Sequence, residues 1–112
     1  MCNHVSWVDA VVLIKTIRPA FAPSSAFQNA PLLSTLINVL DSIYMPQGGS
    51  EDNRIKILQK IKDRQELIEN TGAYAPFLIF PEGTTSNGTC LLKFRKGAFY
   101  SEKKVRPIFM KF

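Results

Sequence analysis

The chain has 112 residues, of which 46% are hydrophobic, and a formal net charge of +5 at pH 7. A chain of this length buries one small core, so we expect a single domain over residues 1–112. This composition excludes a disordered chain, and no apolar run approaches the roughly 18 residues that a membrane-spanning helix needs.

The first half of the chain predicts two helices separated by a short extended segment. Apolar residues at helical spacing indicate a first helix over residues 6–16. Pro19 and Pro23 bound an extended piece. A leucine-rich stripe then predicts a second helix over residues 29–40, with an asparagine at its N-cap. A strand is expected over residues 43–45.

The second half predicts one long helix and two strands. Ser50 is the expected N-cap of a helix over residues 51–70, and Gly72 ends it. The continuous apolar run at residues 77–80 is typical of a strand covered on both faces. A last strand is expected over residues 105–112. The alternation predicts an α/β fold with a central mixed β-sheet flanked by helices.

Positive charge is concentrated in the last third of the chain. Residues 1–75 are neutral overall, so the whole excess lies in residues 76–112. Such a basic field attracts phosphate groups of a small substrate, an acidic membrane surface or nucleic acid, unless it is only a solvated surface. Because no nucleic-acid-binding signature accompanies the charge, we expect no nucleic-acid partner. The clustered basic residues are Lys93, Arg95, Lys96, Lys103, Lys104 and Arg106.

The first motif that carries chemistry is Asn3-His4-Val5-Ser6-Trp7-Val8-Asp9. On a regular helix His4 and Asp9 would point about 140° apart. They can meet if His4 lies in the loop before the helix and Asp9 lies one turn inside it. A carboxylate on one ring nitrogen fixes the tautomer and raises the basicity of the other nitrogen, so His4 would act as a general base. The alternative is an ordinary surface histidine.

The second motif is Phe80-Pro81-Glu82-Gly83-Thr84-Thr85-Ser86-Asn87-Gly88. It follows a predicted buried strand, at the end of a sheet where ligands of open α/β folds bind. Gly83 permits close approach of the backbone, and Thr84 and Thr85 supply hydroxyl donors. We expect Glu82 to contact hydroxyls of an acceptor or to orient a basic group. The alternative is a plain exit from a strand into a turn.

Together these motifs resemble, in this order, the signature blocks of the glycerolipid (lysophospholipid) acyltransferase family. The first resembles the NH-x4-D block and the second the FPEGT block. Residues 89–99 look most like the lysophosphatidylcholine acyltransferase branch, and Val105-Arg106-Pro107 looks like the fourth block of the family.

The resemblance implies an O-acyltransferase that moves an acyl group from acyl-CoA to a free hydroxyl of a lysophospholipid, with acyl-CoA as co-substrate and no cofactor. It makes His4 the general base and Asp9 its orienting partner. It also implies association with a membrane surface, at the endoplasmic reticulum with the site facing the cytosol. The positions it assigns to substrate binding are Glu82, Gly83, Thr84, Thr85 and Pro107.

Two departures from the family pattern stand out. The second block of the family ends with an arginine that binds acceptor phosphate, whereas this chain has Gln47 at that point. Arg54 substitutes for it if the intervening glycine loop folds back, and is otherwise a charge on a helix surface. The chain also starts at the first block and stops at the fourth, so we expect an incomplete acyltransferase core.

Three other functions compete with this one. An incomplete core without activity would act as a module that binds a membrane surface or anionic lipids. A metal site on the single histidine has few strong ligands and lacks H-E-x-x-H spacing. A hydrolase with a covalent nucleophile would lack both G-x-S-x-G and a second histidine. Its candidate nucleophiles are Ser6, Ser86, Cys2 and Cys90, and we expect both cysteines to be free thiols.

Overall fold

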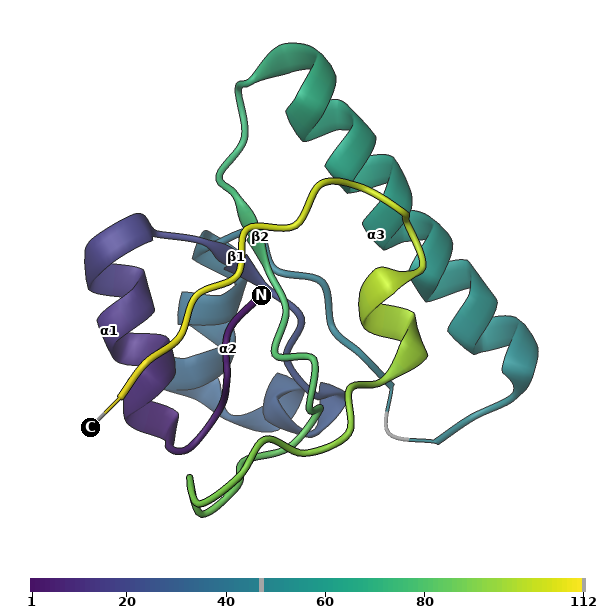
Figure 1. Cartoon of the computed structure of the whole chain (residues 1–112). Helices are drawn as coiled ribbons and strands as arrows, with labels where there is room; N and C mark the ends of the chain where they lie inside the picture. The colour runs from purple at the N-terminus through teal and green to yellow at the C-terminus, as the bar shows by residue number, and fades with distance from the viewer. Residues whose placement is uncertain (47, 112) are drawn as a thin grey trace.

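The computed structural model describes residues 1–46 and 48–111 as a small α/β fold of three α-helices and a two-stranded parallel sheet (Figure 1). In Figure 1 α1 lies to the left of the strands and α3 to their right. The elements are α1 (Trp7–Ile17), β1 (Ala20–Phe21), the 3₁₀ helix η1 (Ser25–Asn29), α2 (Pro31–Val39), α3 (Glu51–Thr71), β2 (Phe77–Leu78) and the 3₁₀ helix η2 (Lys96–Phe99).

All three predicted helices form, and their ends follow from local chemistry. The Ser50 hydroxyl accepts a hydrogen bond from the Asn53 N–H at the start of α3, and Gly72 ends that helix with φ of +61°. The prediction that Asn29 caps α2 was wrong. Asn29 is the last residue of η1, so the N-cap position falls to Ala30, whose side chain makes no capping bond.

The central mixed sheet is not found in the described part of the chain. β1 and β2 pair in parallel, with Ala20 opposite Phe77 and Phe21 opposite Leu78. The segments expected as further strands form only single parallel bridges, Met45 with Ser24 and Ile108 with Cys2. Prolines explain the short pairing, because they lack the N–H group that a ladder needs and they occur beside each of these segments. They are Pro19, Pro23, Pro46, Pro76, Pro81 and Pro107.

The N-terminal segment lies between β2 and the C-terminal segment. The Cys2 N–H donates to the Ile79 carbonyl at 3.2 Å, and the side-chain amide of Asn3 exchanges two hydrogen bonds with the backbone of Met110, at 2.9 and 2.8 Å. Cys2 also belongs to the buried core, which it forms with residues of α1, β1 and β2, namely Leu13, Phe21 and Leu78. These contacts fix the residue that follows, His4, beside the end of β2.

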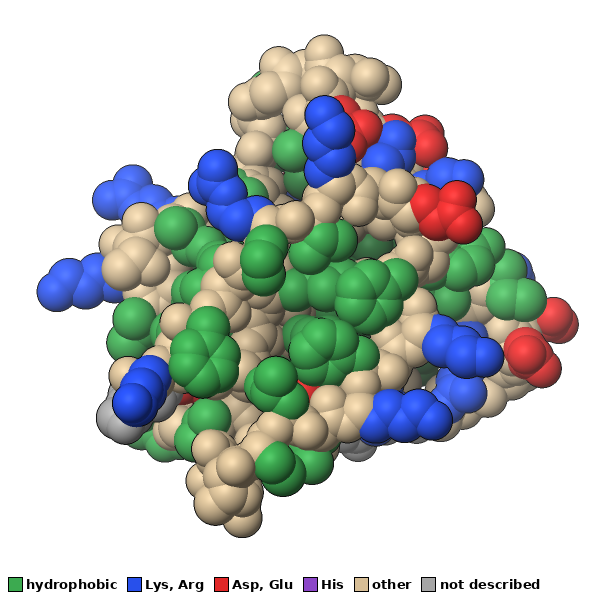
Figure 2. All heavy atoms as spheres, in the orientation of Figure 1, with side chains coloured by type: hydrophobic (Ala, Val, Ile, Leu, Met, Phe, Trp, Pro, Cys, Tyr) green, Lys and Arg blue, Asp and Glu red, His purple; other side chains and the backbone are tan. Residues whose placement is uncertain are grey.

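Many apolar side chains of the predicted helical stripes are exposed rather than buried. Val11 of α1 is 51% exposed and Leu32 of α2 is 88% exposed, while only Ile37 of α2 is buried. Apolar side chains also gather on the face shown in Figure 2, with lysine and arginine side chains around them. No helix in the part of the chain described here is long and apolar enough to cross a membrane.

The position of Cys2 gives a testable prediction about the two thiols. Burial, followed by the negative charge of Asp9, raises the pKa of the Cys2 thiol, whereas Cys90 is exposed. Since the thiolate is the reactive form, we expect iodoacetamide to alkylate Cys90 and to spare Cys2 in the folded protein. Peptide mass spectrometry measures both rates, and guanidinium should make them similar. Equal rates in the folded protein would contradict the buried position of the N-terminal segment.

Candidate active site

The first motif begins α1 with a network of capping hydrogen bonds. Ser6 is the N-cap, and its hydroxyl accepts a hydrogen bond from the Val8 N–H at 3.3 Å. Asp9, in the first turn, curls back toward the preceding loop. Its Oδ2 atom accepts hydrogen bonds from the N–H groups of Val5 at 2.6 Å and Ser6 at 2.9 Å. The carboxylate therefore holds the shape of the loop that carries His4.

His4 lies in this loop, with Nδ1 3.1 Å from Asp9 Oδ2. The imidazole also stacks on the ring of Phe80, with centroids 4.0 Å apart and planes 18° apart. The Asp9 side chain is fully buried and the His4 side chain is 19% exposed. An ionised carboxylate can only accept, so the proton between them belongs to Nδ1. Nε2 is thereby left as the ring nitrogen with a free lone pair.

The Glu82 side chain is buried, with 3% of its residue surface exposed, and both carboxylate oxygens are used. Oε1 accepts from the His4 N–H at 3.1 Å and Oε2 accepts from the Leu92 N–H at 2.8 Å. The Ser86 N–H closes a further bond to the His4 carbonyl at 2.9 Å. The second motif is therefore hydrogen-bonded to the backbone of the first at His4. Binding of acceptor hydroxyls by Glu82 stays a prediction.

The turn after Glu82 carries the next three predicted residues. Gly83 has φ of +70°, in the left-handed region that favours glycine, and Thr84 and Thr85 follow it on the surface. Pro107 is exposed beside Ile108, the residue that pairs with Cys2. The turn is joined to the His4 loop by the bond from the Ser86 N–H to the His4 carbonyl, and Pro107 precedes the residue that pairs with Cys2.

Arg54 is not brought to this group by any contact in the described structure. It lies exposed near the start of α3, and its backbone N–H bonds to the Ser50 carbonyl at 3.3 Å. The prediction for Gln47 falls outside the described residues. Substitution of Arg54 for the arginine of the family pattern stays a prediction that these contacts do not support.

Sequence reasoning missed three neighbours of the site. Phe80 was assigned to the end of a buried strand and the start of the second motif without a role in the site, although its ring stacks on His4. Leu92 contributes a backbone N–H, which no side-chain pattern could reveal. Arg95 was counted within the basic cluster and lies against Gly83.

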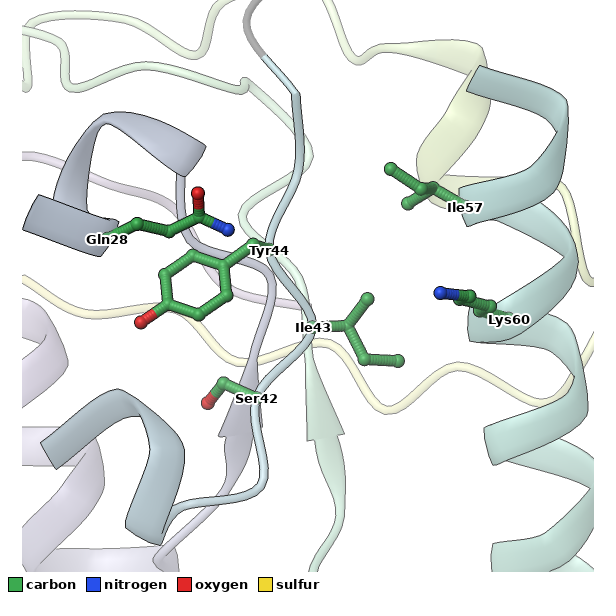
Figure 3. A pocket seen from close by; sticks show the side chains of 6 residues that line it. All are labelled: Gln28, Ser42, Ile43, Tyr44, Ile57 and Lys60. Carbon is green, nitrogen blue, oxygen red and sulfur yellow. The ribbon is translucent and has the colours of Figure 1, made fainter. Parts of the chain in front are cut away.

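A cavity of about 360 Å³ lies elsewhere, between residues 42–44 and α3 (Figure 3). Figure 3 shows Ile43 pointing across it toward Ile57 and Lys60 of α3. None of its lining residues belongs to either motif, so this cavity is not the place of the chemistry described above. Across residues 1–46 and 48–111, no group of three His, Cys, Asp or Glu side chains is placed to hold a metal ion.

Comparison with known proteins identifies the class to which this fold and site belong. The family model described as Acyltransferase matches residues 1–110, so the chain belongs to the acyltransferase family. No solved structure matches the chain significantly.

The curated relatives are named as lysophospholipid acyltransferases. The chain is 32% identical over 109 residues to lysophosphatidylcholine acyltransferase of Drosophila melanogaster, with 97% of this chain and 20% of the relative covered. It is 29% identical over 112 residues to human lysophosphatidylcholine acyltransferase 1, with 100% of this chain and 20% of the relative covered. Lysophospholipid acyltransferase LPEAT1 of Arabidopsis thaliana is 26% identical over 110 residues, with 98% of this chain and 28% of the relative covered. The chain thus spans between 20% and 28% of the length of these relatives.

Proposed function

We propose that the protein transfers a fatty acyl group from acyl-CoA to a free hydroxyl of a lysophospholipid, with His4 as general base. The observation that carries this proposal is the hydrogen bond between His4 Nδ1 and the buried carboxylate of Asp9. It leaves Nε2 able to accept a proton. The names of the relatives support a lysophospholipid as the acceptor.

The proposed reaction uses the imidazole twice. Nε2 takes the proton of the acceptor hydroxyl while the hydroxyl oxygen attacks the thioester carbonyl, and the ionised Asp9 stabilises the imidazolium that forms. The new C–O bond gives a tetrahedral oxyanion. When the C–S bond breaks, the thiolate of CoA leaves and takes the proton from Nε2. Hydrogen-bond donors near the oxyanion would lower the barrier further.

The proposed acceptor and the charge of the chain both favour association of the protein with a membrane surface. Lysophospholipids are membrane components, and the basic residues of positions 76–112 would be drawn to acidic lipids. We place the protein at the endoplasmic reticulum with its site toward the cytosol, on the resemblance of its motifs to the family.

Release of CoA tests this proposal against the inactive binding module. The protein is incubated with a fatty acyl-CoA and a panel of lysophospholipids that differ in headgroup, and the free thiol of CoA is measured. Acyl transfer requires release that depends on the acceptor and yields the diacyl product. Release without acceptor would indicate a thioesterase. Binding to anionic vesicles with no release under any condition would favour the inactive module and overturn the proposal.

A further inference from the structure

The side chain of Arg95 lies directly against Gly83, in the turn that follows Glu82. A Cβ atom at position 83 would be 2.3 Å from Arg95 Nε and 2.7 Å from its Cδ, closer than two such atoms can approach. The backbone of Arg95 is fixed to the same turn, because its N–H donates to the Pro81 carbonyl at 2.8 Å. The Arg95 side chain can lie on the turn because Gly83 has no side chain, and the backbone bond to Pro81 keeps Arg95 beside it.

No carboxylate within residues 1–46 and 48–111 neutralises this cation. The ion pairs found there join His4 with Asp9, Arg64 with Asp41, and Lys103 with two glutamates of α3. Glu82 is adjacent in sequence to Gly83, yet its two oxygens are bound to backbone N–H groups and it forms no ion pair with Arg95. Arg95 is exposed, and its Nε atom lies against Gly83. No hydrogen bond of its guanidinium is found among the described residues, so the guanidinium is open to a ligand or to solvent.

The same turn offers further donors. The backbone N–H groups of Thr84 and Thr85 make no hydrogen bond within the described structure, and both residues are exposed. Consecutive free N–H groups in a turn with a left-handed residue suit an anion. A guanidinium beside them adds a planar pair of donors that matches two oxygens of a phosphate group.

We infer that Arg95, with the turn at Gly83, binds a phosphate group of a substrate and orients that substrate toward His4. This inference rests on the proposed function, which supplies two possible sources of the phosphate group. They are the headgroup of the lysophospholipid and the CoA part of the acyl donor. The Glu82 carboxylate accepts the His4 N–H, so the phosphate would be held one residue away from the group that positions the base.

Binding to soluble probes tests the inference without requiring turnover. The dissociation constants of CoA and of glycerophosphocholine are measured by calorimetry for the wild-type protein and for Arg95→Gln, Arg95→Lys and Lys56→Gln. We expect Arg95→Gln to weaken binding of at least one probe roughly tenfold or more. Arg95→Lys should recover only part of the lost affinity, because the lysine ammonium lacks the planar pair of N–H donors of a guanidinium. Lys56→Gln removes one charge from the exposed surface of α3 and is the matched control.

The affected probe identifies the source of the phosphate. A loss confined to glycerophosphocholine assigns Arg95 to the acceptor, and a loss confined to CoA assigns it to the donor. Equal losses in Arg95→Gln and Lys56→Gln, unchanged dissociation constants, or no binding of either probe to the wild type would overturn the inference. A wild-type protein that binds a probe through Arg95 but releases no CoA would overturn the proposed function alone.

Discussion

Replacement of His4 by alanine is expected to slow acyl transfer roughly 10²–10⁴-fold, the range that a positioned general base contributes, while the protein stays folded. The backbone N–H of residue 4 keeps its bond to Glu82, and Asp9 keeps its bonds to the N–H groups of Val5 and Ser6. The fold loses the hydrogen bond from His4 Nδ1 to Asp9 and the stacking of the imidazole on Phe80. Stacking of this kind is worth about 1 kcal/mol. Steady-state CoA release gives the rate, and urea unfolding gives the stability.

The variant Asp9→Asn is the companion to this test. An asparagine oxygen can still accept from the N–H groups of Val5 and Ser6, so the start of α1 is retained, but the charge that stabilises the imidazolium is lost. We expect a smaller loss of rate than in His4→Ala. If His4→Ala keeps more than about a tenth of the wild-type rate, His4 is not the general base.

Replacement of Glu82 by alanine is expected to destabilise the protein by roughly 3 kcal/mol, because two N–H groups in a partly buried site lose a charged acceptor. These belong to His4 and Leu92, which lie 78 residues before and 10 residues after it. The loop of His4 would also loosen, so the rate should fall in the fraction that remains folded. Urea unfolding followed by circular dichroism measures the stability.

The variant Glu82→Gln separates a structural role from contact with the acceptor. Glutamine retains one acceptor oxygen and can keep one of the two bonds, so we expect roughly half of the destabilisation. The opposite pattern is a loss of activity in Glu82→Ala with an unchanged free energy of unfolding. That result would return Glu82 to the acceptor-binding role that the sequence suggested.

The parts of the site that could be predicted are those governed by short-range geometry. Asp9 is five positions after His4, and the helical angle between them required one residue in the loop and the other in the first turn, as the structure has it. The contacts of Glu82 could not be predicted in this way. The contact with His4 joins segments 78 residues apart, and both contacts use backbone N–H groups, which have no signature among side chains.

The fold shows the same division between local and distant interactions. The three helices were predictable from caps and periodicity, and a one-residue error arose where η1 extends to Asn29. Burial was less predictable, since the spacing of apolar residues predicts a helix but does not show which element packs against its apolar face. Leu32 belongs to the predicted apolar stripe of α2 and is 88% exposed. The expected mixed sheet was wrong because single bridges replace strands where prolines interrupt the backbone donors.

The interlocked ends of the chain have a consequence for the order of folding. Asn3 bonds to Met110, which is 107 residues away, and Cys2 pairs with Ile108. Contacts so distant in sequence close a loop of almost the whole chain, an entropic cost that slows their formation. During synthesis α1 and α3 can form early, but the segment that carries His4 gains its full set of neighbours only once residues 108–110 have left the ribosome. Assembly of the candidate site therefore requires segments from both sides of α3.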